Sequence, residues 1–130
     1  MILQVSRQAD YGVQLVRRLA QLDPGARLSL REFSGESNIS FLFLQKIARR
    51  LKQTKIIDST KGAHGGYFLV RAADGLMLKD VVEAIEGRFG LVDCIKNPGT
   101  CHKTQACSTR PLWEKINQEM AQLLATTPIV

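Results

Sequence analysis

The sequence predicts a mainly α-helical fold with one small β-hairpin, and three observations support this prediction. Apolar residues recur at spacings of three and four along several stretches, as on the buried face of a helix. Two short stretches rich in β-branched and aromatic residues flank the glycine-rich segment 61–66. Pro111 opens a last helical stretch. We expect one compact domain with three segments. Residues 1–88 form its helical body with the hairpin, residues 89–110 form a loop that contains all three cysteines, and residues 111–130 form the last helix.

The composition favours a globular protein with an anionic partner. Of the 130 residues, 45% are hydrophobic and 23% are charged, which is ordinary for a globular domain. No apolar run approaches the roughly 18 residues of a membrane span, and the first residues lack the apolar core of a signal peptide. We therefore expect a cytoplasmic protein with reduced cysteines and no membrane contact. The net charge of +6 favours nucleic acid or another acidic partner.

Three serine residues stand at the starts of helical patterns and predict N-caps, because a serine hydroxyl accepts a hydrogen bond from a first-turn backbone N–H. Ser6 precedes a helix that ends near residue 22, where a Pro-Gly pair follows. Ser29 precedes a short second helix, and Ser40 precedes a third helix over 41–53. The first half of the chain is thus expected to be helical.

The third of these helices has two contrasting faces. Its predicted buried face is apolar and consists of Leu44, Ile47, Ala48 and Leu51. Its opposite face is basic and amide-rich and consists of Gln45, Lys46, Arg49, Arg50, Lys52 and Gln53. Two short helices joined by a tight turn, with the second basic on one face, form a helix-turn-helix pattern. Such a face is more often merely solvated, so this pattern alone does not establish DNA binding.

A predicted hairpin follows the third helix directly. The residues 56–60 and 67–70 read as strands, and Gly65 and Gly66 permit a tight connection between them. Lys61 places a cation at the base of this hairpin. The whole arrangement predicts a winged helix-turn-helix, in which the third helix enters the major groove and the wing reaches the minor groove. His64 is expected to be an exposed turn residue, with a wing contact or a metal ligand as alternatives.

The second half of the chain contains two further predicted helices. Leu78, Val81 and Ile85 lie on one face of a helix that Gly87 ends. The last helix carries an apolar seam that consists of Trp113, Ile116, Met120, Leu123 and Thr127. This seam either packs on its own core or pairs with a second copy. We favour a long dimerisation helix, because DNA readers of this kind usually bind as two-fold dimers.

All three cysteines of the protein lie within residues 94–107, at Cys94, Cys101 and Cys107. The turn-forming residues 97–99 between the first two argue against a helix or a strand. Thiolates that converge from a loop can hold a metal centre, but a closed site usually has about four ligands, so one is missing. Ordinary cysteines, or a redox pair with a spare thiol, are the alternatives.

In this order the segments resemble the Rrf2 family of bacterial winged-helix regulators, over about residues 5–124. The matching pieces are residues 9–11, 38–40, 48–51, 61–67, 80–87, the three cysteines and 112–113. The resemblance implies a homodimer that binds double-stranded promoter DNA. It also implies an iron–sulfur cluster, of the two-iron or four-iron type, that senses redox state, nitric oxide or the supply of iron and clusters. Some members are nitric-oxide-responsive repressors.

The resemblance also implies ligands for the cluster, namely Cys94, Cys101 and Cys107. The IscR-like members place a histidine three residues after the last cysteine, where this chain has Arg110, which cannot bind iron. The NsrR-like members instead use an aspartate before a tyrosine in the first helix, and this chain matches with Asp10. Asp10 of the partner subunit is therefore the leading fourth ligand, ahead of His102 and His64. A carboxylate beside three soft thiolates makes a labile iron.

By the same resemblance, the DNA-binding residues are expected to be Ser40, Gln45, Lys46 and Arg49 on the third helix and Lys61 in the wing. Lys61 stands where an arginine is common, so it keeps the charge but loses the forked geometry. A winged-helix regulator with a zinc site or a thiol–disulfide switch is the main alternative to a cluster sensor. A cysteine-dependent enzyme is disfavoured because no catalytic motif supplies a base. An interaction adaptor would not explain the basic helix.

Overall fold

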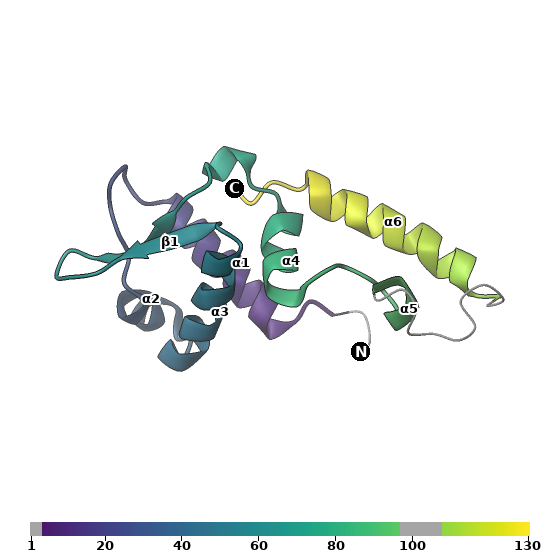
Figure 1. Cartoon of the computed structure of the whole chain (residues 1–130), viewed down its shortest axis with the longest axis horizontal. Coiled ribbons are helices and arrows are strands. Elements are labelled where there is room, and N and C mark those ends of the chain that lie inside the picture. Colours follow the sequence, from purple (N-terminus) through teal and green to yellow (C-terminus); the bar gives the residue numbers. More distant parts are fainter. Residues whose placement is uncertain (1–3, 97–107) are drawn as a thin grey trace.

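The computed structural model describes residues 4–96 and 108–130 of the chain (Figure 1). The described helices and strands, in chain order, are α1 (Arg7–Ala20), α2 (Leu30–Ser37), α3 (Phe41–Gln53), β1 (Ile57–Thr60), β2 (Gly66–Leu69), the 3₁₀ turn η1 (Ala73–Gly75), α4 (Leu78–Glu86), α5 (Asp93–Lys96) and α6 (Arg110–Thr126). The winged helix-turn-helix and the long last helix are thereby confirmed.

Local capping explains where the first helices begin. Oγ of Ser6 accepts a hydrogen bond from the backbone N–H of Ala9 at 3.0 Å, and Oγ of Ser29 accepts one from Glu32 at the same distance. Both bonds satisfy an N–H that has no partner within the helix. Ser40 takes the N-cap position of α3, but its side chain makes no capping bond, contrary to the prediction. Its side chain is exposed instead.

The core lies where α1 packs against α3 and α4. It is built from apolar side chains that are almost fully buried, among them Leu15, Val16, Leu44, Ile47, Leu51, Val81 and Ile85. The predicted apolar face of α3 is therefore confirmed. Gly12 lets α1 approach α4 closely, because a Cβ there would lie 3.0 Å from Cγ1 of Ile85.

The wing is an antiparallel hairpin in which Ile57 pairs with Leu69 and Thr60 with Gly66. Each strand begins one residue away from its predicted start. Lys55 adopts a left-handed conformation, φ 62°, which ends the turn after α3 and leaves Ile56 just before β1. Gly65 is required in the hairpin, because a Cβ there would lie 2.3 Å from the carbonyl oxygen of Thr60.

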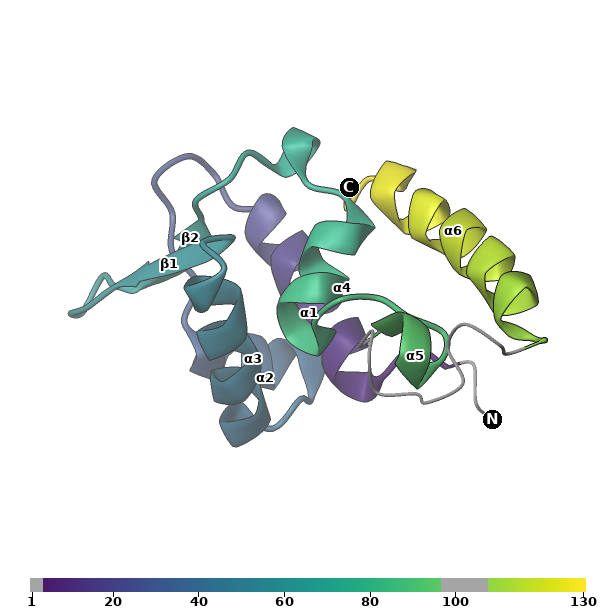
Figure 2. The same cartoon turned by 45° about the vertical axis from the view of Figure 1, so that its right-hand side comes forward.

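The last helix extends along the outer side of α4, away from the wing (Figures 1 and 2). It ends at Thr126, and the final residues turn back to the body of the domain. The backbone N–H of Leu78 donates to the carbonyl of Thr127 at 2.8 Å, and Ile129 donates to Leu76 at 3.0 Å. Ile129 is 4% exposed. The region 111–130 thus combines the long helix with a short segment that anchors its end.

The cysteine region begins differently from the prediction of an irregular loop. Residues Asp93–Lys96 form a single helical turn, so the backbone at Cys94 is helical. Within this turn the side chain of Ile95 is 9% exposed. Cys101, Cys107 and His102 lie outside the residues that the structure describes.

Candidate functional site

The outer face of α3 is basic, because Lys46 and Arg49 are exposed on it. Four exposed side chains share one stripe that begins in the first turn of the helix: Leu42, Gln45, Lys46 and Arg49. The helix contains no acidic residue at all between Phe41 and Gln53. Because apolar residues hold the opposite face in the core, this stripe is fixed toward solvent.

Arg50, which the sequence placed on the same basic face, has a structural role. Its Nη1 donates a hydrogen bond to the carbonyl oxygen of Ile85, in the last turn of α4. A cation at this point is favourable because the C-terminus of a helix carries partial negative charge. Arg50 therefore joins α3 to the end of α4.

The wing is tied to α3 by Lys52. Its Nζ lies 2.9 Å from Oγ of Ser59 and 3.7 Å from Oδ1 of Asp58, both on β1. Beyond this contact, Lys61 and His64 are exposed in the turn of the hairpin. The expectation that His64 is an exposed turn residue is confirmed. The contacts of Lys52 thus hold the hairpin in a fixed position beside α3.

Two arginines that the sequence patterns did not single out stack on aromatic rings of the wing and of α3. The guanidinium of Arg27 lies 3.9 Å from the ring centre of Phe68 in β2, and that of Arg31 lies 4.3 Å from the ring centre of Phe41 at the start of α3. Stacking on a ring restrains a cation without neutralising it. Both pairs join residues from separate elements, so no local spacing predicts them.

An ion pair between α1 and α2 supports the helix-turn-helix. Nε and Nη2 of Arg18 donate to the carboxylate of Glu36 at 2.9 and 3.2 Å. The hydrogen bond from Arg18 lowers the pKa of Glu36 below its usual value, and the same bond raises the pKa of Arg18. Neighbouring charge thus keeps both groups ionised.

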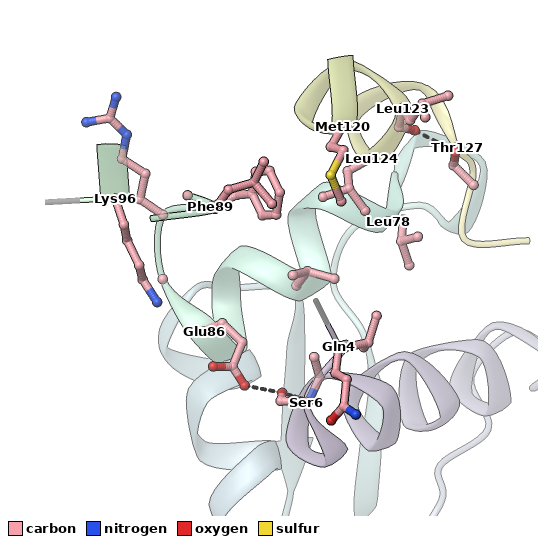
Figure 3. Close-up of a pocket in the computed structure, with 17 residues that line it drawn as sticks. Gln4, Ser6, Leu78, Glu86, Phe89, Lys96, Met120, Leu123, Leu124 and Thr127 are labelled. Carbon is pink, nitrogen blue, oxygen red and sulfur yellow. Dashed lines mark hydrogen bonds between the residues drawn. The ribbon is translucent and has the colours of Figure 1, made fainter. Parts of the chain in front are cut away.

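Asp10 lies in the first turn of α1, and its carboxylate is exposed and accepts a hydrogen bond from Nε2 of Gln14 at 3.1 Å. The same end of α1 is attached to α4, because Oγ of Ser6 donates to the carboxylate of Glu86 (Figure 3). Within residues 4–96 and 108–130, no three His, Cys, Asp or Glu side chains converge as a metal site would require. Asp10 is therefore not brought together with other candidate ligands in that part of the chain.

The segment between α4 and the cysteines runs from α4 toward α6. Gly87 ends α4 with φ 81°, a conformation that favours glycine. The backbone N–H of Leu91 then donates to Oδ1 of Asn117 on α6 at 2.8 Å. This segment therefore connects the end of α4, the first cysteine and the last helix.

An apolar pocket of about 580 Å³ opens beside this segment, between the start of α1, α4 and α6 (Figure 3). Leu78, Phe89, Met120 and Leu124 line it, and the Ser6–Glu86 hydrogen bond lies at one end. The sequence did not predict this pocket because its walls come from three separated parts of the chain.

The seam of α6 is largely open in the single chain. Three of its apolar side chains and the adjacent Leu112 have exposed fractions between 39% and 65%; the three are Trp113, Ile116 and Leu123. No residue of this helix is buried. Such a row of exposed apolar residues marks an interaction surface rather than a solvated face.

No helix among residues 4–96 and 108–130 has the length and apolar character needed to cross a membrane.

Comparison with known proteins places these features in context. The family model Rrf2, described as an iron-dependent transcriptional regulator, matches residues 5–129. Protein rrf2 of Nitratidesulfovibrio vulgaris is 29% identical over 124 residues, which cover 95% of this chain and 83% of that protein.

Two solved structures share the fold. CymR, the global cysteine regulator of B. subtilis, superposes with a TM-score of 0.80 at 24% identity, covering 98% of this chain and 93% of that one. IscR of T. potens superposes with a TM-score of 0.77 at 25% identity, covering 98% and 83%. The fold is thus shared with both CymR and IscR.

Proposed function

The chain belongs to the Rrf2 family of iron-dependent transcriptional regulators, and from that premise we propose that an iron–sulfur cluster controls its binding to promoter DNA. As a member of this family it is a DNA-binding transcription regulator, and its relatives are regulators rather than enzymes. One observation carries the proposal. Residues 87–93 link α4 to Cys94, and the last two residues of α4 are bonded to the N-cap of α1 and to α3.

We place the DNA against α3 and the wing. Gln45, Lys46 and Arg49 face outward along α3, and a recognition helix presents such side chains to base edges and phosphates. The exposed hydroxyl of Ser40 stands at the N-terminus of α3, where free backbone N–H groups attract a phosphate. Lys61 extends the same charge along the wing to the neighbouring groove.

The cluster is assigned to Cys94, Cys101 and Cys107, with Asp10 of the partner subunit as fourth ligand. Three thiolates suit iron, and the cluster would supply a centre that redox agents or nitric oxide can alter. The exposure of Asp10 at the start of α1 supports this role, because a ligand given to a second subunit must face outward. Arg110 at the start of α6 forms an ion pair with Glu114 at 2.5 Å, which suits a structural role.

Control of DNA binding is argued from the bonds at the end of α4. The carboxylate of Glu86 holds Ser6 at the start of α1, and the carbonyl of Ile85 holds Arg50 on α3. A shift of the segment that follows Gly87 would act on both contacts. The position of α3 would then depend on the state of the cysteines, as a two-state switch requires.

A homodimer completes this proposal. The open seam of α6 offers an apolar surface, and pairing of two such helices covers it without a second kind of partner. Two subunits would place two copies of α3 against successive major grooves, about 34 Å apart. In this proposal the dimer would also bring Asp10 of one subunit toward the cysteines of the other.

A second candidate keeps the DNA binding but gives the cysteines another role, as a zinc site or a thiol–disulfide switch. The likeness to CymR, a cysteine regulator, is as strong as the likeness to IscR. Zinc would also accept three thiolates with a nitrogen or oxygen ligand. The two candidates therefore differ in metal content rather than in fold.

The proposal is tested with Cys101→Ser and Asp10→Ala, each compared with the wild type purified without oxygen. Cys101→Ser should lose the cluster absorption and the response of DNA binding to air or nitric oxide. Asp10→Ala should retain iron at first but lose it faster, with an altered spectrum, whereas the matched Asp23→Ala should not. If Cys101→Ser keeps both its iron and its response, the cluster proposal is wrong.

A further inference from the structure

Leu42 is an exposed apolar side chain on the proposed DNA-facing surface, and the basic charge of that surface does not explain why it is exposed. It lies in the first turn of α3 with 70% of its surface exposed, which is more than Leu112, Trp113 or Leu123 on α6. Exposing a leucine loses the free energy that its burial would gain. A partner that covers this side chain would recover that free energy.

The position of Leu42 identifies the partner. Lys46 and Arg49 follow it at spacings of four and seven, so all three share the exposed stripe of α3. The helix α6 lies on the opposite side of the domain from α3, so Leu42 does not belong to its seam (Figures 1 and 2). Its neighbours are cationic, and the helix has no acidic residue. The expected partner is thus anionic and yet offers an apolar group.

From this geometry, and resting on the proposed placement of DNA against α3, we propose that Leu42 reads the C5-methyl group of a thymine. In the major groove, the thymine methyl is the apolar group that a base pair presents, and apolar side chains recognise it by contact. The N-terminal residues of a recognition helix are those that reach base edges, and Leu42 is the second residue of α3. Leu42 is thereby a specificity residue, while Lys46 and Arg49 supply charge.

The stacked Arg31–Phe41 pair supports this assignment. Phe41 precedes Leu42 directly and is held by the guanidinium of Arg31 at 4.3 Å, while Phe43, on the other side, meets the ring of Tyr11 with centroids 5.4 Å apart. Both neighbours of Leu42 are therefore restrained. A restrained backbone lets a short apolar side chain discriminate between groups that differ by one methyl.

The experiment uses the full-length protein. A duplex is first selected by the wild type from a random pool, and each thymine in one half-site is then replaced by uracil, which lacks only the methyl group. We expect uracil at one position to weaken wild-type binding about fourfold, the value of one buried methyl-sized group. Leu42→Ala should bind the thymine and uracil duplexes equally. The control Val70→Ala, another exposed apolar residue but outside α3, should retain the fourfold preference.

The outcomes separate the two proposals. If no duplex is enriched, the placement of DNA against α3 fails, and the role of Leu42 fails with it. If a duplex is enriched but no uracil substitution changes wild-type affinity, or Leu42→Ala keeps the preference, DNA binding stands and the methyl-reading role is overturned. Circular dichroism of Leu42→Ala should match the wild type, because the side chain is outside the core.

Discussion

At the scale of single residues, the basic side chains of this domain divide into distinct roles. Lys46 and Arg49 point to solvent from α3, whereas Arg50 holds α4, and Arg27 and Arg31 stack on rings. Net charge alone does not reveal this division. Each role predicts a different response to substitution, because loss of a solvent-facing cation affects the partner and loss of a bonded one affects the domain.

Lys46→Ala should weaken DNA binding on all sequences and lower the salt dependence of the affinity by about one unit of log–log slope, because one fewer counterion is released. Iron content and the absorption spectrum should stay unchanged. The matched control is Lys115→Ala on α6, which removes the same charge far from α3. Equal losses in the two variants would show that net charge, and not the face of α3, governs binding.

Glu36→Gln should alter the dependence of stability on pH. The bond from Arg18 lowers the pKa of Glu36 in the folded protein, so its ionised form stabilises the fold above the ordinary carboxyl pKa. That contribution is lost as the pH falls through the lowered value. Urea unfolding should therefore show a small difference between wild type and variant near about pH 7.

This difference should disappear at a pH below the lowered pKa. The effect is expected to be small because the pair is exposed. A difference that persists unchanged in acid would mean that packing, rather than charge, explains it.

At the scale of elements, the end of α4 is the junction of the domain. It is bonded to α1 through Ser6 and to α3 through Arg50, and it leads into the segment that contains Cys94. The proposed signal from the cysteines thus has a short path to the DNA-facing helix. Because each of these two bonds is made by one side chain from the N-cap of α1 or from α3, single substitutions should separate cluster binding from control of DNA binding.

Arg50→Met should uncouple the state of the cluster from the affinity for DNA. The variant keeps the apolar stem but loses the bond to the carbonyl of Ile85, so α3 no longer follows the end of α4. We expect an unchanged iron content and a ratio of affinities, between protein with and without cluster, that approaches one. Anisotropy titrations of both forms measure this ratio.

A loss of affinity that is equal in both forms leaves the ratio as in wild type. That result would mean that Arg50 only orients or charges α3, and the proposed path would be wrong.

The sequence predicted the elements well because helix boundaries depend on near neighbours. Ser6, Ser29 and Gly87 mark ends that the structure confirms. The sequence did not predict long-range contacts. The hydrogen bonds between Ser6 and Glu86 and between Arg50 and Ile85 join residues that no periodic spacing relates. The cap at Ser40 was wrong in its bond though right in its position.

The same limit applied to the candidate site. The exposed positions on α3 followed from its periodicity, since the buried face fixes the other one. The stacked arginines did not, because their rings lie on other elements. The role of Asp10 rests on a resemblance, and its ligation stays a prediction.

At the scale of the whole molecule, two surfaces face apart. The helix α3 and the wing lie at one end, and α6 with its open seam lies at the other (Figure 2). This separation suits a dimer that joins through α6 and presents a reading helix from each subunit. If the two surfaces lay on the same side of the domain, DNA and the second subunit would compete for the same space.

Ile116→Glu should therefore produce a monomer. A charge in the middle of the seam opposes burial against a second copy. Sedimentation velocity should show about half the mass of the wild type, and affinity for a two-half-site duplex should fall strongly. Gln118→Glu, also on α6 but off the seam, is the control and should remain dimeric. If Ile116→Glu also keeps the wild-type mass, the seam is not the dimer interface.

The most direct test of the central claim is the iron, zinc and acid-labile sulfide content of protein purified without oxygen, measured with its visible absorption and its DNA affinity. The account predicts iron and sulfide together, a broad visible band that bleaches with air or nitric oxide, and a DNA affinity that changes as the band bleaches. Colourless protein that contains zinc, or that holds no metal after an attempt to rebuild the cluster and binds DNA unchanged, would contradict it.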